Sequence, residues 1–226
     1  MGYSFGPPPI VKNGLISCID GSQKNASGNL IDTVSNLALT ENGVTKLNTK
    51  GGEIDFDGTD DSIVQAADTR FNNIGTGPFS ILFWLDIDAV SQYPGIWRLT
   101  NATNVHGPND QRLKFQNSDT MLHFQIDGNN NVVIDDTDQS VAGSGYHHYA
   151  ITRENNGNMK GYFDNDLKST VDTSGQSLAS SNSTVTIGEN SHYLNGRLGQ
   201  MLFYNRELTA AEVSQNYNSQ RTRFGI

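Results

Sequence analysis

Short apolar runs separated by Gly, Asn and Asp make up most of the pattern along this chain. Residues 53–57 alternate strictly between acidic and apolar side chains, which predicts a strand with Ile54 and Phe56 on its buried face. Residues 79–85 are almost continuously apolar, as expected for a strand covered on both faces in the middle of a sandwich. Further strands are expected at residues 15–20, 95–99, 113–116, 121–126, 132–134, 147–153, 160–163, 185–187 and 199–204.

One segment has the chemistry of a helix. Thr209 and Glu212 fit a capping box, in which the hydroxyl and the carboxylate satisfy each other's first-turn amides. A helix is therefore expected from Ala210 to Ser219, with Val213 and Tyr217 on one face. Many strands and one terminal helix indicate an antiparallel two-sheet architecture.

The start of the chain differs from the rest. Pro7–Pro9 favour an extended polyproline II conformation, and the preceding Tyr3 and Phe5 are apolar. Such an arm is either strapped onto the body or docks onto a partner, and both alternatives stay open. Because no internal repeat or linker divides the remainder, we expect an extended Pro-rich arm over residues 1–12 and one domain over residues 13–226.

The composition of the chain excludes several classes of function. The chain has 226 residues, a net charge of -9 and one cysteine, Cys18. This length suits one large all-β domain, and a single cysteine cannot form a disulfide within the chain. The net negative charge argues against nucleic acid as a partner, because binding to phosphate groups needs a basic surface. No stretch approaches the roughly 18 apolar residues that a membrane-spanning helix needs, so no membrane insertion is expected.

Six segments resemble laminin-G-like domains of the concanavalin A-like lectin/glucanase superfamily. They occur in the family's order at residues 56–61, 79–84, 146–153, 193–199, 203–209 and 212–217. The resemblance covers the chain from Gly14 to its end, and it implies an all-β fold: a concanavalin A-like jelly-roll β-sandwich of two antiparallel sheets with one short C-terminal helix. The long first loop that is usual in the family is replaced here by the short segment 21–29.

The two ends of the chain resemble virion proteins of tailed bacteriophages that carry this domain. The segments concerned are Gly6–Leu15 and Asn216–Ile226. This resemblance implies a non-enzymatic virion structural protein, used as a capsid decoration protein or as a fibre, neck or tail component. Its expected partners are capsid or tail proteins, or further copies of itself in a homo-oligomer. The residues expected to dock the arm are Tyr3, Phe5, Pro7, Pro8 and Pro9.

The acidic side of residues 53–57 suggests a different activity. Glucanases of the same superfamily use an E-x-D-x-E strand, in which one acid attacks the sugar and another protonates the leaving group. Glu53, Asp55 and Asp57 share one face of the expected strand, but Asp57 is one methylene shorter than the glutamate of that motif. The polar positions of this strand face solvent in laminin-G-like domains. We therefore expect a solvated strand and no enzymatic activity, with a glucanase as the remote alternative.

No cofactor is expected from the sequence, and calcium at the acidic loops is the alternative that stays open. Laminin-G-like domains often bind this ion at a sheet rim, through the carboxylate and carbonyl oxygens that a hard cation prefers. The richest acidic loops contain Asp60, Asp61, Asp135, Asp136 and Asp138. The alternative for these residues is that they are only solvated.

A carbohydrate-binding lectin module that recognises host or environmental glycans is the rival to the virion reading. Tyr93 and Trp97 are the candidates for stacking on a sugar, although the core is the favoured place for Trp97. His147 and His148 are adjacent on an expected strand, so they point to opposite faces and cannot share one metal ion. Cys18 is expected to be a buried thiol, and the sequence contains no Ser-His-Asp elbow motif.

Overall fold

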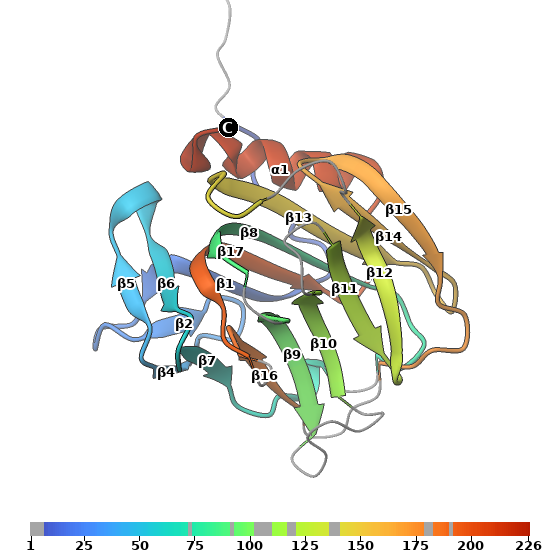
Figure 1. Cartoon of the computed structure of the whole chain (residues 1–226), viewed down its shortest axis with the longest axis horizontal. Coiled ribbons are helices and arrows are strands. Elements are labelled where there is room, and N and C mark those ends of the chain that lie inside the picture. The colour runs from blue at the N-terminus through green and yellow to red at the C-terminus, as the bar shows by residue number, and fades with distance from the viewer. Residues whose placement is uncertain are drawn as a thin grey trace, which may run out of the picture.

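The computed structural model shows two antiparallel sheets packed face to face, with one helix on the outside (Figure 1). It describes residues 7–71, 74–90, 93–101, 110–116, 121–135, 141–178, 183–189 and 192–226. The large sheet has the order β15-β14-β13-β8-β17-β1-β2-β3, and β6 joins it through β17 and carries β5. The small sheet has the order β12-β11-β10-β9-β16-β7-β4. The expected all-β sandwich is confirmed.

The strands of the large sheet are β1 (Leu15–Lys24), β2 (Leu30–Asp32), β3 (Leu37–Ala38), β5 (Thr45–Leu47), β6 (Glu53–Asp57), β8 (Phe79–Ala89), β13 (Tyr146–Arg153), β14 (Asn158–Phe163), β15 (Asp166–Asp172) and β17 (Asn195–Tyr204). Those of the small sheet are β4 (Thr40–Asn42), β7 (Ser62–Gln65), β9 (Gly95–Asn101), β10 (Asp110–Phe115), β11 (Met121–Ile126), β12 (Asn129–Asp135) and β16 (Ser183–Ile187). The helices are two 3-10 turns, η1 (Thr49–Gly51) and η2 (Thr69–Phe71), and α1 (Ala210–Phe224).

The core lies between the two sheets and is rich in aromatic rings. The Trp97 ring of β9 is stacked on Phe203 of β17 at 5.7 Å, and it meets Phe124 of β11 edge-on at 5.8 Å. Phe79 of β8 contacts the same Phe124 and Phe203 rings, which ties the two sheets together. Alternation along β8 sends Phe79, Ile81, Phe83, Leu85 and Ile87 into this core.

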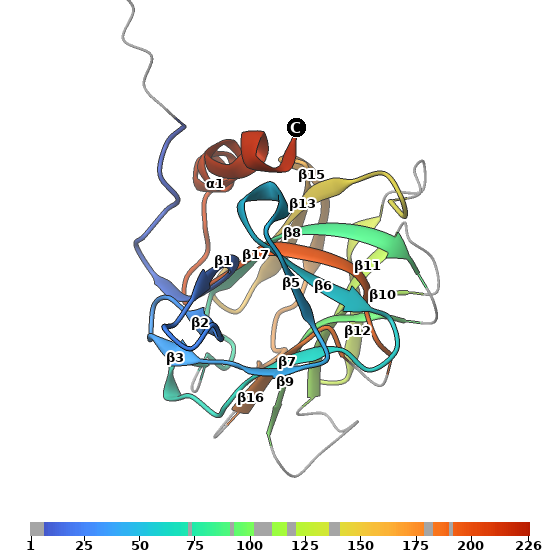
Figure 2. The ribbon, with the colours of Figure 1, turned by 90° about the vertical axis from the view of Figure 1, so that its left-hand side faces the viewer.

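The opposite face of β8 packs under α1 (Figure 2). Here Trp84 is stacked on Phe224 at 4.8 Å and on Tyr217 at 5.6 Å. Both faces of β8 are therefore covered, as its continuous apolar run predicts. No helix among the described residues is long and apolar enough to cross a membrane.

The helix α1 begins where the sequence predicts and ends later. Its capping box is formed, since Thr209 Oγ1 accepts from the Glu212 amide while Glu212 Oε2 accepts from the Thr209 amide. The helix runs to Phe224 instead of ending at Ser219, because Gly225 supplies the left-handed residue that ends it, with φ of 88°. The extra turn brings Phe224 onto the aromatic cluster of the large sheet.

Candidate functional site

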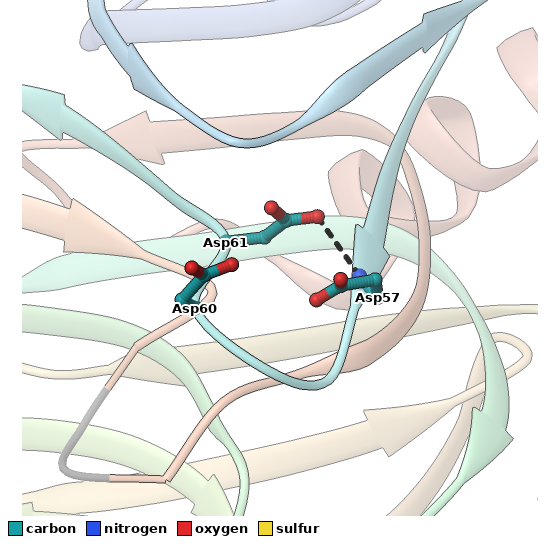
Figure 3. Close-up of side chains that lie close together, drawn as sticks. All are labelled: Asp57, Asp60 and Asp61. Atoms are coloured by element: carbon teal, nitrogen blue, oxygen red, sulfur yellow. Dashed lines mark hydrogen bonds between the residues drawn. The ribbon is translucent and has the colours of Figure 1, made fainter.

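A turn at the edge of the sandwich brings three carboxylates together. Asp57 ends β6 of the large sheet, and Asp60 and Asp61 precede β7 of the small sheet, so the turn crosses from one sheet to the other (Figure 3). Each side chain offers a carboxylate oxygen within 4.8 Å of the other two. Gly58 turns the chain back at φ of 80°. We call these three residues the acidic turn.

The acidic turn concentrates negative charge. Asp61 is only 5% exposed, and its Oδ2 accepts a hydrogen bond of 2.9 Å from the amide of Asp57. Burial raises the pKa of Asp61, and the nearby carboxylates of Asp57 and Asp60 raise it further. Within the described ranges, no lysine or arginine forms an ion pair with any of the three. Such a set of oxygens fits a hard cation such as calcium, which would replace the missing positive charge.

The acidic turn contains only part of the predicted metal set. Asp60 and Asp61 are brought together, but Asp135 ends β12 at the opposite edge of the small sheet. The two acidic loops therefore cannot form one site. Asp136 and Asp138 lie outside the described residues. The third carboxylate of the acidic turn is instead that of Asp57, which was expected to belong only to the acidic strand. The spacing Asp57-x-x-Asp60-Asp61 directly after a strand is the sequence signal that could have identified Asp57.

The acidic strand does not have the solvated face expected from the sequence. Glu53, Asp55 and Asp57 do lie opposite the buried Ile54 and Phe56, but Glu53 is only 3% exposed, so the prediction is wrong at this residue. Glu53 is buried by tertiary contacts with a strand that is distant in sequence. The β1 backbone at Gly21 lies so close that a Cβ there would be 2.8 Å from the Glu53 backbone.

Glu53 is also held by its neighbours. Its Oε2 accepts a hydrogen bond from the Thr49 hydroxyl. Burial raises the pKa of the Tyr146 phenol, and the nearby Glu53 carboxylate raises it further. A carboxylate that is buried in this way cannot contact a glycosidic bond, which argues against the glucanase alternative at this strand.

The two candidates for sugar stacking lie in different environments. Trp97 is 1% exposed between the sheets, so it belongs to the core and presents no ring face to a glycan. Tyr93 is 38% exposed just before β9, with its backbone in the left-handed region at φ of 52°. The Lys114 ammonium lies 5.4 Å from the Tyr93 ring centre, and His192 meets the ring edge-on at 6.1 Å.

The N-terminal segment is fastened to the body from Pro9 onward. The Val11 amide donates to Asn216 Oδ1 of α1 at 2.8 Å, and Gln215 Nε2 donates to the Pro9 carbonyl at 2.8 Å. The Tyr204 hydroxyl donates to the Val11 carbonyl at 2.9 Å. Pro7, Pro8 and Pro9 are exposed, while Tyr3 and Phe5 of the predicted docking arm lie outside the described residues.

A groove runs beside this segment. It has a volume of about 560 Å³ and lies between Pro7–Pro9, the second half of β1 and the last turns of α1. Its polar floor includes Asp20 and Arg223, which form a two-pronged ion pair with distances of 2.6 and 2.9 Å. Cys18 lies against the groove as a buried thiol, as expected, and burial raises its pKa.

The two adjacent histidines point to opposite sides, as predicted. His148 is 1% exposed and packs on Trp84 at 4.9 Å, and burial lowers its pKa to about 4. His147 is half-buried and hydrogen-bonded to both Ser144 and Asp164. They therefore cannot share one metal ion.

Comparisons with known proteins agree with this architecture. A sequence model of the laminin G type, described as the concanavalin A-like lectin/glucanases superfamily, matches residues 57–214. No curated protein sequence matches the chain. The receptor binding domain of botulinum neurotoxin C/D mosaic serotype superposes with a TM-score of 0.72 at 17% identity, over 93% of this chain and 52% of that one.

Two further structures carry bound sugars. The serotype D neurotoxin ligand binding domain in complex with N-acetylneuraminic acid has a TM-score of 0.70 at 17% identity, over 92% of this chain and 51% of that one. Domain 4 of AbnA, a GH43 extracellular arabinanase from Geobacillus stearothermophilus, in complex with arabinotriose, has a TM-score of 0.69 at 14% identity, over 90% of this chain and 98% of that one.

The chain spans about half the length of the neurotoxin domains that it matches. At these identities the structural likeness shows the fold alone. The sequence match covers well over half of the chain, and the two-sheet topology agrees with it. The chain belongs to the concanavalin A-like lectin/glucanases superfamily.

Proposed function

We propose that this chain is a structural protein of a bacteriophage particle, in which the sandwich forms a rigid body and the N-terminal arm attaches it. One observation carries the proposal. The two end segments whose sequences resemble virion proteins pack against each other: the Val11 amide of the first donates to Asn216 of the second, and Gln215, directly before the second segment, donates to the Pro9 carbonyl. Arg206 adds a bond of 2.9 Å to the Asn13 carbonyl. The resemblance thus falls on one three-dimensional unit instead of two unrelated ends.

The exposed prolines suit an attachment role. Pro7, Pro8 and Pro9 have no backbone N–H that would lose its hydrogen bond to water on docking. An extended proline segment is also already restricted in conformation, so little conformational entropy is lost when it binds. Apolar surface buried by such a segment contributes about 25 cal/mol per Å². When many copies of the chain bind to one particle, such weak contacts act together and the overall attachment is strong. The role requires no catalysis by the acidic strand.

A truncation tests the attachment role. Removal of residues 1–9 takes away the exposed prolines, together with the bond from Gln215 to the Pro9 carbonyl, and leaves the Val11 bonds to α1 and Tyr204 in place. Added to particles that lack the protein, the full chain and a Tyr93→Ala control are expected to co-sediment with them, and the truncated chain is expected to remain in the supernatant. Equal co-sedimentation of the truncated chain would overturn the role of the arm.

Glycan binding is the second candidate, and Tyr93 favours it. An exposed aromatic ring beside a lysine and a histidine can stack on a sugar ring and hydrogen-bond its hydroxyl groups. The neurotoxin and arabinanase domains with bound sugars support the same reading at the level of the fold. A glycan array probed with the full chain and with Tyr93→Ala would test it. Saturable binding to one sugar class that is lost in the variant is the expected result, and equal signals for both proteins would exclude Tyr93.

A further inference from the structure

Three residues outside the acidic turn form a continuous hydrogen-bond chain. Ser144 Oγ lies 2.8 Å from His147 Nε2, and His147 Nδ1 lies 2.6 Å from Asp164 Oδ2. Ser144 lies in the turn before β13, His147 is on β13, and Asp164 lies in the tight turn between β14 and β15. A carboxylate only accepts hydrogen bonds, so Nδ1 is the donor to Asp164 and Nε2 is the nitrogen that faces the serine.

The imidazole and the carboxylate are held in place. The second oxygen of Asp164 accepts from the His148 amide at 2.8 Å, and the Asp164 amide donates to the His148 carbonyl at 2.8 Å. The Phe163 ring is stacked on the His147 ring at 4.7 Å. The carboxylate is therefore fixed by the backbone of the strand that carries the histidine, and the imidazole is supported by a ring from the neighbouring strand. A base oriented in this way is the requirement for an activated serine.

The serine is accessible. Ser144 is exposed and lies between Gly143 and Gly145, whose φ angles are 73° and 95°. A Cβ at either glycine would meet no atom within 4 Å, so the space around the hydroxyl is open. Among the described residues, no group accepts a hydrogen bond from the amide of Gly145. The N–H of the residue after a nucleophilic serine is a donor that can stabilise an oxyanion.

We propose that Ser144, His147 and Asp164 form a catalytic triad that hydrolyses short-chain O-acyl esters. Ser144 is the nucleophile, His147 the general base and acid, and Asp164 the positioning residue. Because the serine stands on an open turn, the acyl group is small and the alcohol that carries it remains in solvent, as on an acylated polysaccharide. This activity goes beyond the proposed structural role, and it departs from the expectation of a protein without enzymatic activity.

The chemistry balances with water as the only co-reactant. Ser144 Oγ attacks the ester carbonyl while its proton passes to His147 Nε2, and the oxyanion faces the Gly145 amide. The carbon–oxygen bond to the alcohol then breaks, and the alcohol leaves with the proton from Nε2. Water attacks the acyl-serine in the same way, so a carboxylic acid leaves and Ser144 regains its proton. At rest the hydroxyl also lies 2.6 Å from the Val141 carbonyl, so attack requires the hydroxyl proton to turn towards Nε2.

Two measurements on the full chain test the triad. The first is labelling with a fluorophosphonate probe, followed by mass spectrometry of the modified peptide. The second is hydrolysis of p-nitrophenyl acetate. Ser174→Ala is the matched control, since Ser174 is also exposed and bonds an aspartate, Asp172, but has no imidazole partner in the part of the chain that the structure describes. We expect the adduct on Ser144, a loss of at least about 100-fold in kcat/KM for Ser144→Ala, and no loss for the control.

Two variants separate catalysis from structure. His147→Ala is expected to lose activity and to regain part of it when free imidazole is added, which a purely structural histidine would not show. Asp164→Asn keeps the bond from the His148 amide and is expected to lower kcat with KM unchanged. Hydrolysis by Ser144→Ala at the wild-type rate, or the absence of a Ser144 adduct, would overturn the proposal. Either result would leave the arm and its particle attachment unaffected.

Discussion

Replacement of Asp61 by asparagine tests how the acidic turn balances its charges. The three carboxylates lie within 4.8 Å of one another, and at that separation two unit charges repel by about 1 kcal/mol in water-like surroundings. This figure applies because Asp57 and Asp60 are exposed. Loss of the Asp61 charge therefore relieves about 2 kcal/mol, since it has two such neighbours. The asparagine oxygen still accepts from the Asp57 amide, but a neutral acceptor weakens that bond by about 1 kcal/mol.

The variant is therefore expected to be more stable than the wild type in chelator, by about 1 kcal/mol. For a chain of this size that corresponds to a rise in Tm of about 2–4 °C. Added calcium is expected to raise the Tm of the wild type and to have little effect on the variant, since an ion that binds only the folded state stabilises it by mass action. Differential scanning calorimetry in chelator and in calcium measures both effects.

The pH dependence has a definite sign. The folded state raises the pKa of Asp61, so it binds the proton more tightly than the unfolded chain does. Stability that depends on this proton is present at low pH and is lost as the pH rises through the raised pKa. The advantage of Asp61→Asn should thus vanish in acid and grow towards neutral pH. If Asp61→Asn is less stable than the wild type in chelator at pH 7, the argument from charge repulsion is refuted. If added calcium leaves the wild-type Tm unchanged, the acidic turn does not bind calcium.

Three further predictions follow from the buried groups. Phe224→Ala should cost about 3–5 kcal/mol in urea denaturation, because the ring fills the space between Trp84 and Tyr146; a cost below about 1 kcal/mol would mean that α1 is only loosely attached. His148 titrates at about 4 when folded and at about 6.5 when unfolded, so wild-type stability should fall by up to about 3 kcal/mol as the pH drops through this window. His148→Gln should flatten that slope, and an unchanged slope would assign it to other groups. Cys18 should react with a thiol reagent only after unfolding, and rapid labelling of the native protein at pH 8 would contradict its burial.

The sequence predicts the elements whose apolar pattern is strong and local. The strand β6 with Ile54 and Phe56 buried, the continuous apolar run in β8 and the capping box of α1 are all confirmed. Strand β15 was not predicted, because its side chains are mostly exposed at the edge of the large sheet and show no apolar face. Short strands such as β2 and β3 were missed for a related reason, since two or three residues cannot show a period.

The sites depended more on tertiary structure than the strands did. The burial of Glu53 comes from the close approach of β1 and from Tyr146 of β13, neither of which is near it in sequence. Ser144 and His147 are three residues apart, but their partner Asp164 is in a hairpin turn 17 residues beyond His147. Spacing alone cannot show that this turn folds back over the histidine. Asp60 and Asp61 were found because they lie in one turn, where sequence neighbours are also neighbours in space.

The two tryptophans lie on opposite sides of the large sheet. Trp97 is enclosed between the sheets, whereas Trp84 lies beneath α1, stacked on Phe224 and next to His148. Their fluorescence therefore reports on two separate layers of the molecule. In a chain with Trp97→Phe, the emission of Trp84 would follow the detachment of α1, and in a chain with Trp84→Phe the emission of Trp97 would follow the separation of the sheets. The order of the two signals during unfolding would show whether the helix can leave an intact sandwich, and so whether the N-terminal arm that is bonded to that helix can be released without loss of the fold.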